Sequence, residues 1–564
     1  AVESAVHAGY PADAGGVLLI EVESVAEGID DTMSLIVEIC RAHHAREVRH
    51  ASTAAERSAL WLGRKSALGA MGRIAPSYFL EDGVVPRHKL PEVMAFIEAV
   101  AERCRLPIGN FFHAGDGNIH PTILFDRRDE DALARARRAA NEILEKCIAV
   151  GGTVSGEHGI GTEKQDYMAL LYTADDLDAM WDVKRSFDPH GQLNPGKIFP
   201  RTYRPPAQGA DGARAHVAEF MPVTKAVAVQ TAWPARDGRT VAALERIVGS
   251  AAVEVADDNG YPSPGEMPFV VVRPASVAEV AEVLCFAGAE RLGVAPVGGG
   301  TMRCLGGPPA RIDIVLGLDR LDKVVEHYPS DLTLAVQAGA TLASINEQLA
   351  AARQMLPLDV PLPHRSTVGG IIAAGAPAAG LRRLAYGTAR DMLLGIQVVR
   401  PDGRSFRRGR MVVKNVAGYD LVRLQYGALG ALGVITAANF KLQPLPEESA
   451  AAIGTFATPA AAESVVRQLL AARLQPAAVL VISDVEHTPR KRWQLWVRFD
   501  GRYRAVLRQA SEVVELARAA AGASVAALDA KTVDERWPAL VDFSQMADVG
   551  DDEVLLRINV RSSD

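Results

Sequence analysis

Three consecutive glycines near the middle of the chain most constrain how it can fold. They are Gly298–Gly300, within the loop Pro296–Gly307, and glycine accepts positive φ and close backbone approach. Successive backbone N–H groups in such a loop can point at a diphosphate. A Rossmann fingerprint would open a helix, whereas this loop leads into a predicted strand at Arg311–Leu316. The loop therefore predicts a phosphate-binding turn of another fold, with a simple surface turn as the alternative.

Further glycine-rich motifs follow in the same half of the chain. They are Thr367–Gly375 (TVGGIIAAG), Tyr386–Asp391 (YGTARD), Lys414–Asp420 (KNVAGYD) and Gly427–Ile435 (GALGALGVI). Motifs in this order are hard to obtain by chance. Over roughly residues 225–450 the order resembles the FAD-binding domain of the p-cresol methylhydroxylase type. More narrowly, it resembles the small FAD-binding subunit of bacterial glycolate oxidase.

The resemblance implies a set of FAD contacts. The diphosphate would meet Gly298, Gly299, Gly300 and Thr301, the flavin and ribose would meet Gly369, Gly370, Gly387 and Asp391, and Gly433, Val434 and Ile435 would flank the dinucleotide. Some relatives attach FAD covalently through a histidine in the first loop. This loop contains no histidine, so we expect non-covalent FAD. Ala428 stands where many relatives carry serine, which removes one hydroxyl.

Two histidine motifs lie in the first half of the chain. His113–His120 (HAGDGNIH) places two imidazoles on either side of a tight glycine turn, and Ser155–Gly161 (SGEHGIG) adds Glu157 and His158. Two histidines and a carboxylate form a reasonable divalent-metal set, and a neutral histidine beside a metal-bound oxygen can take its proton. A lone histidine is more often an ordinary polar loop residue, but two dense motifs in one region favour a site.

These motifs, together with Asp188–Phe199 (DPHGQLNPGKIF), resemble the C-terminal domain of FAD-linked 2-hydroxy-acid dehydrogenases over roughly residues 1–200. The resemblance implies His113, His120 and Glu157 as ligands of zinc, manganese or iron, His158 as the base, Arg64 at the substrate carboxylate and Asn194 near the flavin. Lys164 is either a second cationic contact or a solvated surface lysine. Relatives often carry His-Leu-Asn where this chain has His120-Pro-Thr. Because that asparagine is absent, the motif does not predict which 2-hydroxy acid is the substrate.

Mixed strand and helix patterns predict an α+β fold, and the length of 564 residues predicts three or four domains. We expect an FAD-linked oxidase C-terminal cap at 1–200, a linker at 201–225, a p-cresol methylhydroxylase-type FAD-binding domain at 226–446 and a partial second cap at 447–564. Among the predicted elements are a strand at Gly16–Ser24 and helices at Thr32–Arg46, Ala174–Phe187 and Ser276–Arg291. In the tail, Trp493–Phe499 alternates apolar and polar residues, with Trp496 as the exception.

The order of the domains has two interpretations. The motifs of the first half resemble a group that includes the large FAD subunit of glycolate oxidase. In that group the FAD domain precedes the cap, whereas here the cap comes first. The simpler interpretation is a fusion of a large subunit lacking its flavin domain with a small subunit, cut at both ends. The alternative is a permuted enzyme whose cap folds over its own FAD domain. The fusion predicts a histidine cluster that opens toward an absent domain, and the permuted enzyme predicts a cluster that faces the flavin of the same chain.

The composition of the chain limits the kinds of partner that it can have. Five cysteines without a Cys-x-x-Cys pair argue against an iron–sulfur cluster in this chain, so a separate iron–sulfur subunit or a quinone would receive the electrons. A net charge of −7 disfavours nucleic acid, and no apolar run reaches the roughly 18 residues of a membrane helix. We expect a cytoplasmic protein, with attachment to the inner membrane through a partner as the alternative.

The resemblance implies that this component oxidises a small 2-hydroxy acid, with glycolate or D-lactate as the leading substrates. Two other functions remain open. One is a non-catalytic FAD-binding subunit of a larger complex. It is favoured because no flavin domain precedes the cap in this sequence, as one does in the large subunit. The other is an alcohol or sugar oxidase of the same flavin family, which the metal set disfavours.

Overall fold

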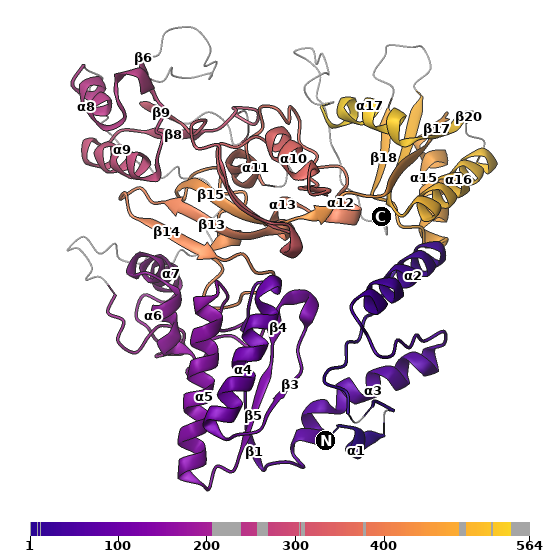
Figure 1. Cartoon of the computed structure of the whole chain (residues 1–564). Coiled ribbons are helices and arrows are strands. Elements are labelled where there is room, and N and C mark those ends of the chain that lie inside the picture. The colour runs from indigo at the N-terminus through magenta and orange to yellow at the C-terminus, as the bar shows by residue number, and fades with distance from the viewer. Residues whose placement is uncertain are drawn as a thin grey trace.

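The structure is a computed structural model that describes residues 2–7, 9–11, 13–205, 238–255, 269–303, 305, 311–375, 380–483, 492–520 and 523–542. Helices and strands are mixed throughout, so the α+β prediction is confirmed. A cap region up to residue 205 lies against one side of a central region, and a tail region from residue 447 stands at one end (Figure 1). Of the predicted linker, residues 206–225 lie outside the described residues.

The cap region contains a three-stranded antiparallel sheet with two long helices against it. Val93, Ile97 and Val100 recur at helical spacing on one of these helices and are fully buried, as an amphipathic face requires. The sheet order is β1-β5-β3. The strands are β1 (Ser77–Leu80), β2 (Gly83–Val84), β3 (Ile108–Asn110), β4 (Asn118–Ile119) and β5 (Pro121–Phe125), and the helices are α1 (Val2–Val6), α2 (Ala26–Ala42), α3 (Ala54–Met71), α4 (Leu90–Cys104), α5 (Glu130–Ala149), α6 (Met168–Leu171) and α7 (Ala174–Phe187).

The strand predicted at Gly16–Ser24 is wrong, because the structure leaves this segment without regular secondary structure. High β-propensity does not make a strand without a neighbouring strand to complete its hydrogen bonds. Leu18 is 66% exposed, so the apolar side chains of the segment do not enter a core.

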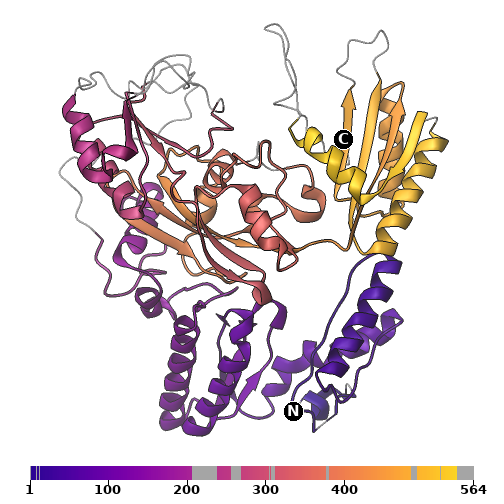
Figure 2. The same ribbon diagram turned by 45° about the horizontal axis from the view of Figure 1, so that its top comes forward.

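Helix α2 starts at Ala26, six residues before its predicted start at Thr32. Its first turns lie against a tail helix that is far away in the sequence (Figures 1 and 2). Glu27 and Asp31 pair there with Arg508 and Arg504 at 3.2 and 3.3 Å. Sequence spacing does not show this tertiary contact.

The central region holds two sheets. In the four-stranded sheet β6-β7-β9-β8, strands β7, β9 and β8 run parallel, and the five-stranded sheet β10-β11-β15-β13-β14 is antiparallel. Ser276, the first residue of a predicted helix, is the N-cap of α9, and its side chain accepts from the N–H of Glu279. The strands are β6 (Val253–Val255), β7 (Val270–Val272), β8 (Val294–Val297), β9 (Ile314–Gly317), β10 (Val324–Tyr328), β11 (Thr333–Gln337), β12 (Gln354–Met355), β13 (Leu393–Val399), β14 (Ser405–Gly409), β15 (Val434–Lys441) and β16 (Gln443–Pro444). The helices are α8 (Gly238–Val248), α9 (Val277–Glu290), α10 (Leu342–Ala350), α11 (Val368–Ala374), α12 (Arg383–Tyr386), α13 (Ala389–Met392) and α14 (Leu421–Leu424).

The cap lies directly on the central region. One hydrophobic core contains Met180 and Phe199 from the cap and Phe406 from β14. The hydroxyl of Tyr172 donates to the carbonyl of Ala417 at 3.1 Å. The cap thus packs on the central region of its own chain. The permuted interpretation, in which the histidine cluster faces a flavin bound to the same chain, stays a prediction. The fusion stays a prediction about the origin of the chain.

The tail forms a βαββαβ unit with sheet order β18-β19-β17-β20, the split βαβ arrangement. Trp496 is exceptional on β19 because it belongs to a second core, with Trp537 of α17, on the opposite sheet face from Leu495. The prediction that residues 447–564 form only part of a second cap domain stays a prediction. The unit consists of β17 (Glu448–Phe456), α15 (Pro459–Ala471), β18 (Ala478–Ser483), β19 (Trp493–Gly501), α16 (Tyr503–Ala519) and β20 (Ala523–Leu528), and α17 (Ala530–Val541) follows it.

Candidate functional site

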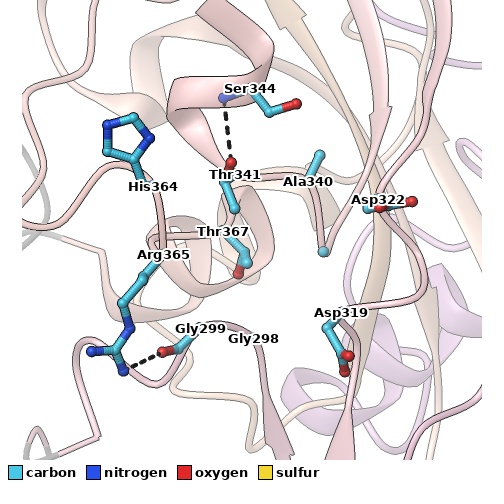
Figure 3. A pocket seen from close by; sticks show the side chains of 11 residues that line it. Gly298, Gly299, Asp319, Asp322, Ala340, Thr341, Ser344, His364, Arg365 and Thr367 are labelled. Carbon is cyan, nitrogen blue, oxygen red and sulfur yellow. Dashed lines mark hydrogen bonds between the residues drawn. The ribbon is translucent and has the colours of Figure 1, made fainter.

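A pocket with a volume of about 290 Å³ lies beside the glycine loop (Figure 3). It is formed by the loop after β8, the turn after β9 and the segments that lead into α10 and α11. Figure 3 shows Arg365 on one side of the pocket and Asp319 and Asp322 on the other. An anionic group of a ligand would therefore bind near Arg365, and a hydroxyl group would bind near the carboxylates of Asp319 and Asp322.

The backbone of the glycine loop suits a diphosphate. Among the described residues, the N–H groups of Gly298–Thr301 have no partner within the chain, so they can donate to phosphate oxygens. The loop also lies too close to its neighbours for a side chain. A Cβ atom on Gly299 would lie 1.7 Å from the carbonyl oxygen of Arg365, and one on Gly298 would lie 2.0 Å from Thr367 Oγ1. These features fit FAD.

The other predicted cofactor residues have various structural roles. Gly369 contacts Ala338, where a Cβ would lie 2.9 Å from the Ala338 side chain, and Gly370 donates its N–H to Thr367. Gly387 has a φ of +75° and ends α12, and Asp391 accepts two hydrogen bonds from Thr388. Thr301 shares a hydrogen bond with Ser366, and Gly433 precedes β15. The side chains of Val434 and Ile435 are buried in two hydrophobic cores, so only their backbone could flank a dinucleotide.

The histidine motifs form one cluster at the cap. Potential ligand atoms of His113, His120 and Glu157 all lie within 4.8 Å of one another. The sharp turn that brings the histidines together depends on Gly117, whose φ is +69° and whose Cβ would lie 2.1 Å from the carbonyl oxygen of Val85. The ring of His158 stacks on that of His120, with centroids 5.6 Å apart. The predicted metal ligands and the predicted base are therefore neighbours.

His120 is the buried member of the cluster. Burial lowers the pKa of its imidazole, which favours the neutral ring that metal ligation requires. Its Nδ1 lies 3.3 Å from the carbonyl oxygen of Glu81. A carbonyl accepts from Nδ1–H, which leaves Nε2 as the nitrogen with a free lone pair. Together these features fit a divalent cation.

Asp82, which the sequence did not single out, positions the loop that carries Glu157 and His158. Its buried Oδ2 accepts from the backbone N–H groups of Glu157 and His158 at 3.0 and 2.8 Å and from Ser155 Oγ at 2.9 Å. Its Oδ1 accepts from the side-chain amide of Asn118. Burial opposes the charge, but these hydrogen bonds keep the pKa of Asp82 below its usual value. The oxygens of Asp82 are thus occupied within the protein, whereas the carboxylate of Glu157 is 39% exposed and reachable by a cation.

Replacing Asp82 with asparagine is expected to weaken metal binding by roughly 10–100-fold, as loss of an outer partner of metal ligands typically does. The amide keeps the size of the side chain but cannot accept every bond that now orients Glu157 and His158. Titration with Mn²⁺ or Zn²⁺ measures the affinity. Asp129→Asn is the control, because Asp129 also accepts two backbone N–H groups but caps α5 instead. Unchanged affinity in Asp82→Asn would contradict the positioning role.

The central region also reaches this cluster. Lys414 Nζ donates to Glu157 Oε1 at 2.6 Å and lies 3.0 Å from Asp116 Oδ2. Lys414 belongs to the KNVAGYD motif, which helped to identify the resemblance but received no role from the sequence. The charge of Lys414 within this motif is the one sequence signal that could have pointed to it.

The remaining predicted residues lie at different places. The guanidinium of Arg64 lies 5.1 Å above the ring of Phe111, whose centroid is 6.4 Å from that of His120. The role of Arg64 at the substrate carboxylate stays a prediction. Lys164 is buried and donates to the carbonyl of Val154, so its interpretation as a solvated surface lysine is wrong. Asn194 is exposed in the loop after α7, with a φ of 44°. Its place near a flavin stays a prediction.

Family models match two parts of the chain. Residues 1–198 match the model "FAD linked oxidases, C-terminal domain", and residues 268–409 match the model "FAD binding domain". The two kinds of domain that the motifs predicted are therefore both present. In the described residues, no helix combines the length and apolar character needed to cross a membrane.

Curated relatives resemble parts of the chain. The glycolate oxidase subunit GlcD of Escherichia coli K12 is 44% identical over 36% of this chain and 41% of its own length, and the subunit GlcE of the same strain is 32% identical over 32% and 48%. A probable mitochondrial D-lactate dehydrogenase of Danio rerio is 30% identical over 49% of this chain and 57% of its own length. The chain thus spans less than two thirds of each of these relatives.

Proposed function

We propose that this chain is a component of an FAD-linked dehydrogenase that oxidises a small 2-hydroxy acid to the 2-oxo acid. The observation that supports it most is the cluster of His113, His120, Glu157 and His158 against the FAD-binding motifs of the same chain. The match to GlcD and to D-lactate dehydrogenase agrees with glycolate and D-lactate as leading substrates.

The side chains have distinct tasks in this proposal. FAD, held without a covalent bond at Gly298–Thr301, would supply the two-electron acceptor. A divalent cation held by His113, His120 and Glu157 would supply positive charge that acidifies a hydroxyl group. His158 is partly exposed, so its imidazole can accept the hydroxyl proton, and Asp82 fixes its backbone. Arg64 remains a candidate for the substrate carboxylate.

The electrons must then leave the flavin. We propose that a separate iron–sulfur subunit or a quinone receives them, and that the protein is cytoplasmic or attached to the inner membrane through such a partner. The match to GlcE supports assembly with other subunits. It also supports the second candidate function, a non-catalytic FAD-binding subunit.

Anaerobic addition of glycolate or D-lactate to the purified full chain is expected to bleach its flavin absorbance. His158→Gln is expected to slow the bleaching by roughly 10²–10⁴-fold, the usual contribution of a general base, while the bound flavin remains. Absorbance at the flavin bands measures both. His44→Gln is the control, since His44 is exposed just after the end of α2. Bound flavin that neither acid bleaches would favour the non-catalytic subunit and contradict the proposed enzyme.

A further inference from the structure

We propose that Lys414 binds the carboxylate of the 2-hydroxy acid, and that without substrate its ammonium group rests on Glu157 and competes there with the metal. This inference rests on the proposed function and assigns a specificity-determining residue to it. It gives the central region a direct part in a site whose other members come from the cap.

The inference rests on the position of the ammonium group of Lys414. Lys414 Nζ lies 2.6 Å from Glu157 Oε1, and Glu157 Oε1 lies 3.9 Å from His113 Nε2. The ammonium is therefore next to a carboxylate that is one of the potential metal ligands. In a 2-hydroxy acid the carboxylate is attached to the carbon that bears the hydroxyl. A substrate whose hydroxyl faces the cluster would thus have its carboxylate within reach of Lys414.

The backbone around Lys414 is held in place against the cap. Asn415 Oδ1 accepts from Thr153 Oγ1 at 3.3 Å, and the N–H of Val416 donates to the carbonyl of Ser155 at 3.1 Å. These bonds join the lysine loop to the segment that carries Glu157. The side chain of Lys414 has four flexible carbons, so the ammonium can move while its backbone stays fixed.

The present partners of Lys414 are exchangeable. The side chains of Lys414, Glu157 and Asp116 are 31%, 39% and 42% exposed, and ion pairs this open to water are weak. Lys164, by contrast, is buried and bonded to the carbonyl of Val154, so it is not free to follow a ligand. Lys414 is therefore the lysine at this cluster that can exchange a protein carboxylate for that of the substrate.

The test measures the affinities for Mn²⁺ and for oxalate, which the substitution of Lys414 is expected to change in opposite directions. In Lys414→Met, Mn²⁺ is expected to bind the full chain roughly 3–10-fold more tightly, because no ammonium competes for Glu157. Oxalate has a carboxylate beside an oxygen-bearing carbon but no hydride to give. Its binding to the Mn²⁺-loaded protein is expected to weaken by roughly 10–100-fold, because a charge-assisted hydrogen bond is lost. Calorimetry measures both without turnover.

Two further variants complete the experiment. Lys414→Arg is expected to restore most of the oxalate affinity, because it restores the positive charge. Lys146→Met is the matched control, since Lys146 Nζ also lies 2.6 Å from a carboxylate, that of Glu92. Weaker binding of both Mn²⁺ and oxalate in Lys414→Met would indicate only a structural role, and wild-type values for both would equally overturn the proposal. A wild-type flavin that is not bleached would refute the enzyme itself, and these titrations do not depend on it.

Discussion

Replacing Gly299 with alanine is expected to lower the FAD content of the purified chain to near zero. The new Cβ would lie 1.7 Å from the carbonyl oxygen of Arg365 and 2.6 Å from its carbonyl carbon. Both are backbone atoms, so no side chain can rotate away and the loop itself must move. Residues 298–301 would then no longer direct their free N–H groups at one point, which a bound diphosphate requires.

The measurement is the ratio of flavin absorbance to protein absorbance, followed by titration with added FAD. We expect the dissociation constant to rise by at least roughly 100-fold, which corresponds to about 2.7 kcal/mol. Gly69→Ala is the control, because a Cβ at Gly69 on α3 meets no atom within 4 Å. If Gly299→Ala retained FAD at the wild-type ratio, the phosphate site could not be this loop.

Local patterns predicted much of this fold. Helix α7 has its predicted bounds, Ala174–Phe187, because a Thr173 capping box marks its start and Asp188-Pro189 follows its end. The side chain of Ser276 caps α9 for the same kind of reason. Such signals involve residues only a few positions apart, so the sequence displays them directly.

Contacts between distant segments were not predictable in the same way. The strand expected at Gly16–Ser24 has strand-like composition but no sheet to join, and α2 begins early where it contacts α16. The histidine cluster was predicted from two dense motifs, yet Asp82 stands in neither of them. The role of Asp82 depends on contacts between the end of β1, β4 and the loop after α5, which are distant in the sequence. The contact of Lys414 with Glu157 likewise joins the central region to the cap.

Replacing Asp500 with asparagine is expected to destabilise the chain by about 3–5 kcal/mol, the usual cost of breaking a buried ion pair by removing one partner. Asp500 is fully buried at the junction of the tail and the central region. Its Oδ1 accepts from Arg498 Nε at 2.8 Å and from Ser449 Oγ at 2.9 Å. Its Oδ2 accepts from Arg382 Nη1 at 3.3 Å and from Tyr386 at 3.2 Å. Asparagine would leave two buried guanidinium groups with one fewer anion.

The contribution of Asp500 depends on pH in a defined direction. Burial would raise its pKa, but Arg498 and Arg382 outweigh burial and hold the pKa below its usual value. A carboxylate with a lowered pKa stabilises the folded state fully above its unfolded pKa of about 4, and this stabilisation is lost as the pH falls through the folded-state value. The stability difference between wild type and Asp500→Asn should therefore be constant near pH 7 and shrink below about pH 4.

Guanidinium denaturation followed by tryptophan fluorescence measures the stability difference between wild type and Asp500→Asn. The fluorescence reports on a tryptophan near the substituted residue. The guanidinium of Arg498 lies 4.7 Å above the ring of Trp537, so loss of the ion pair alters the surroundings of that ring. Asp534→Asn, an exposed carboxylate on α17, is the control. The double variant Asp500→Asn, Arg498→Met should regain part of the stability, because it removes a cation that would otherwise stay buried without its anion. If the double variant is no more stable than Asp500→Asn, the loss does not come from an unpaired Arg498.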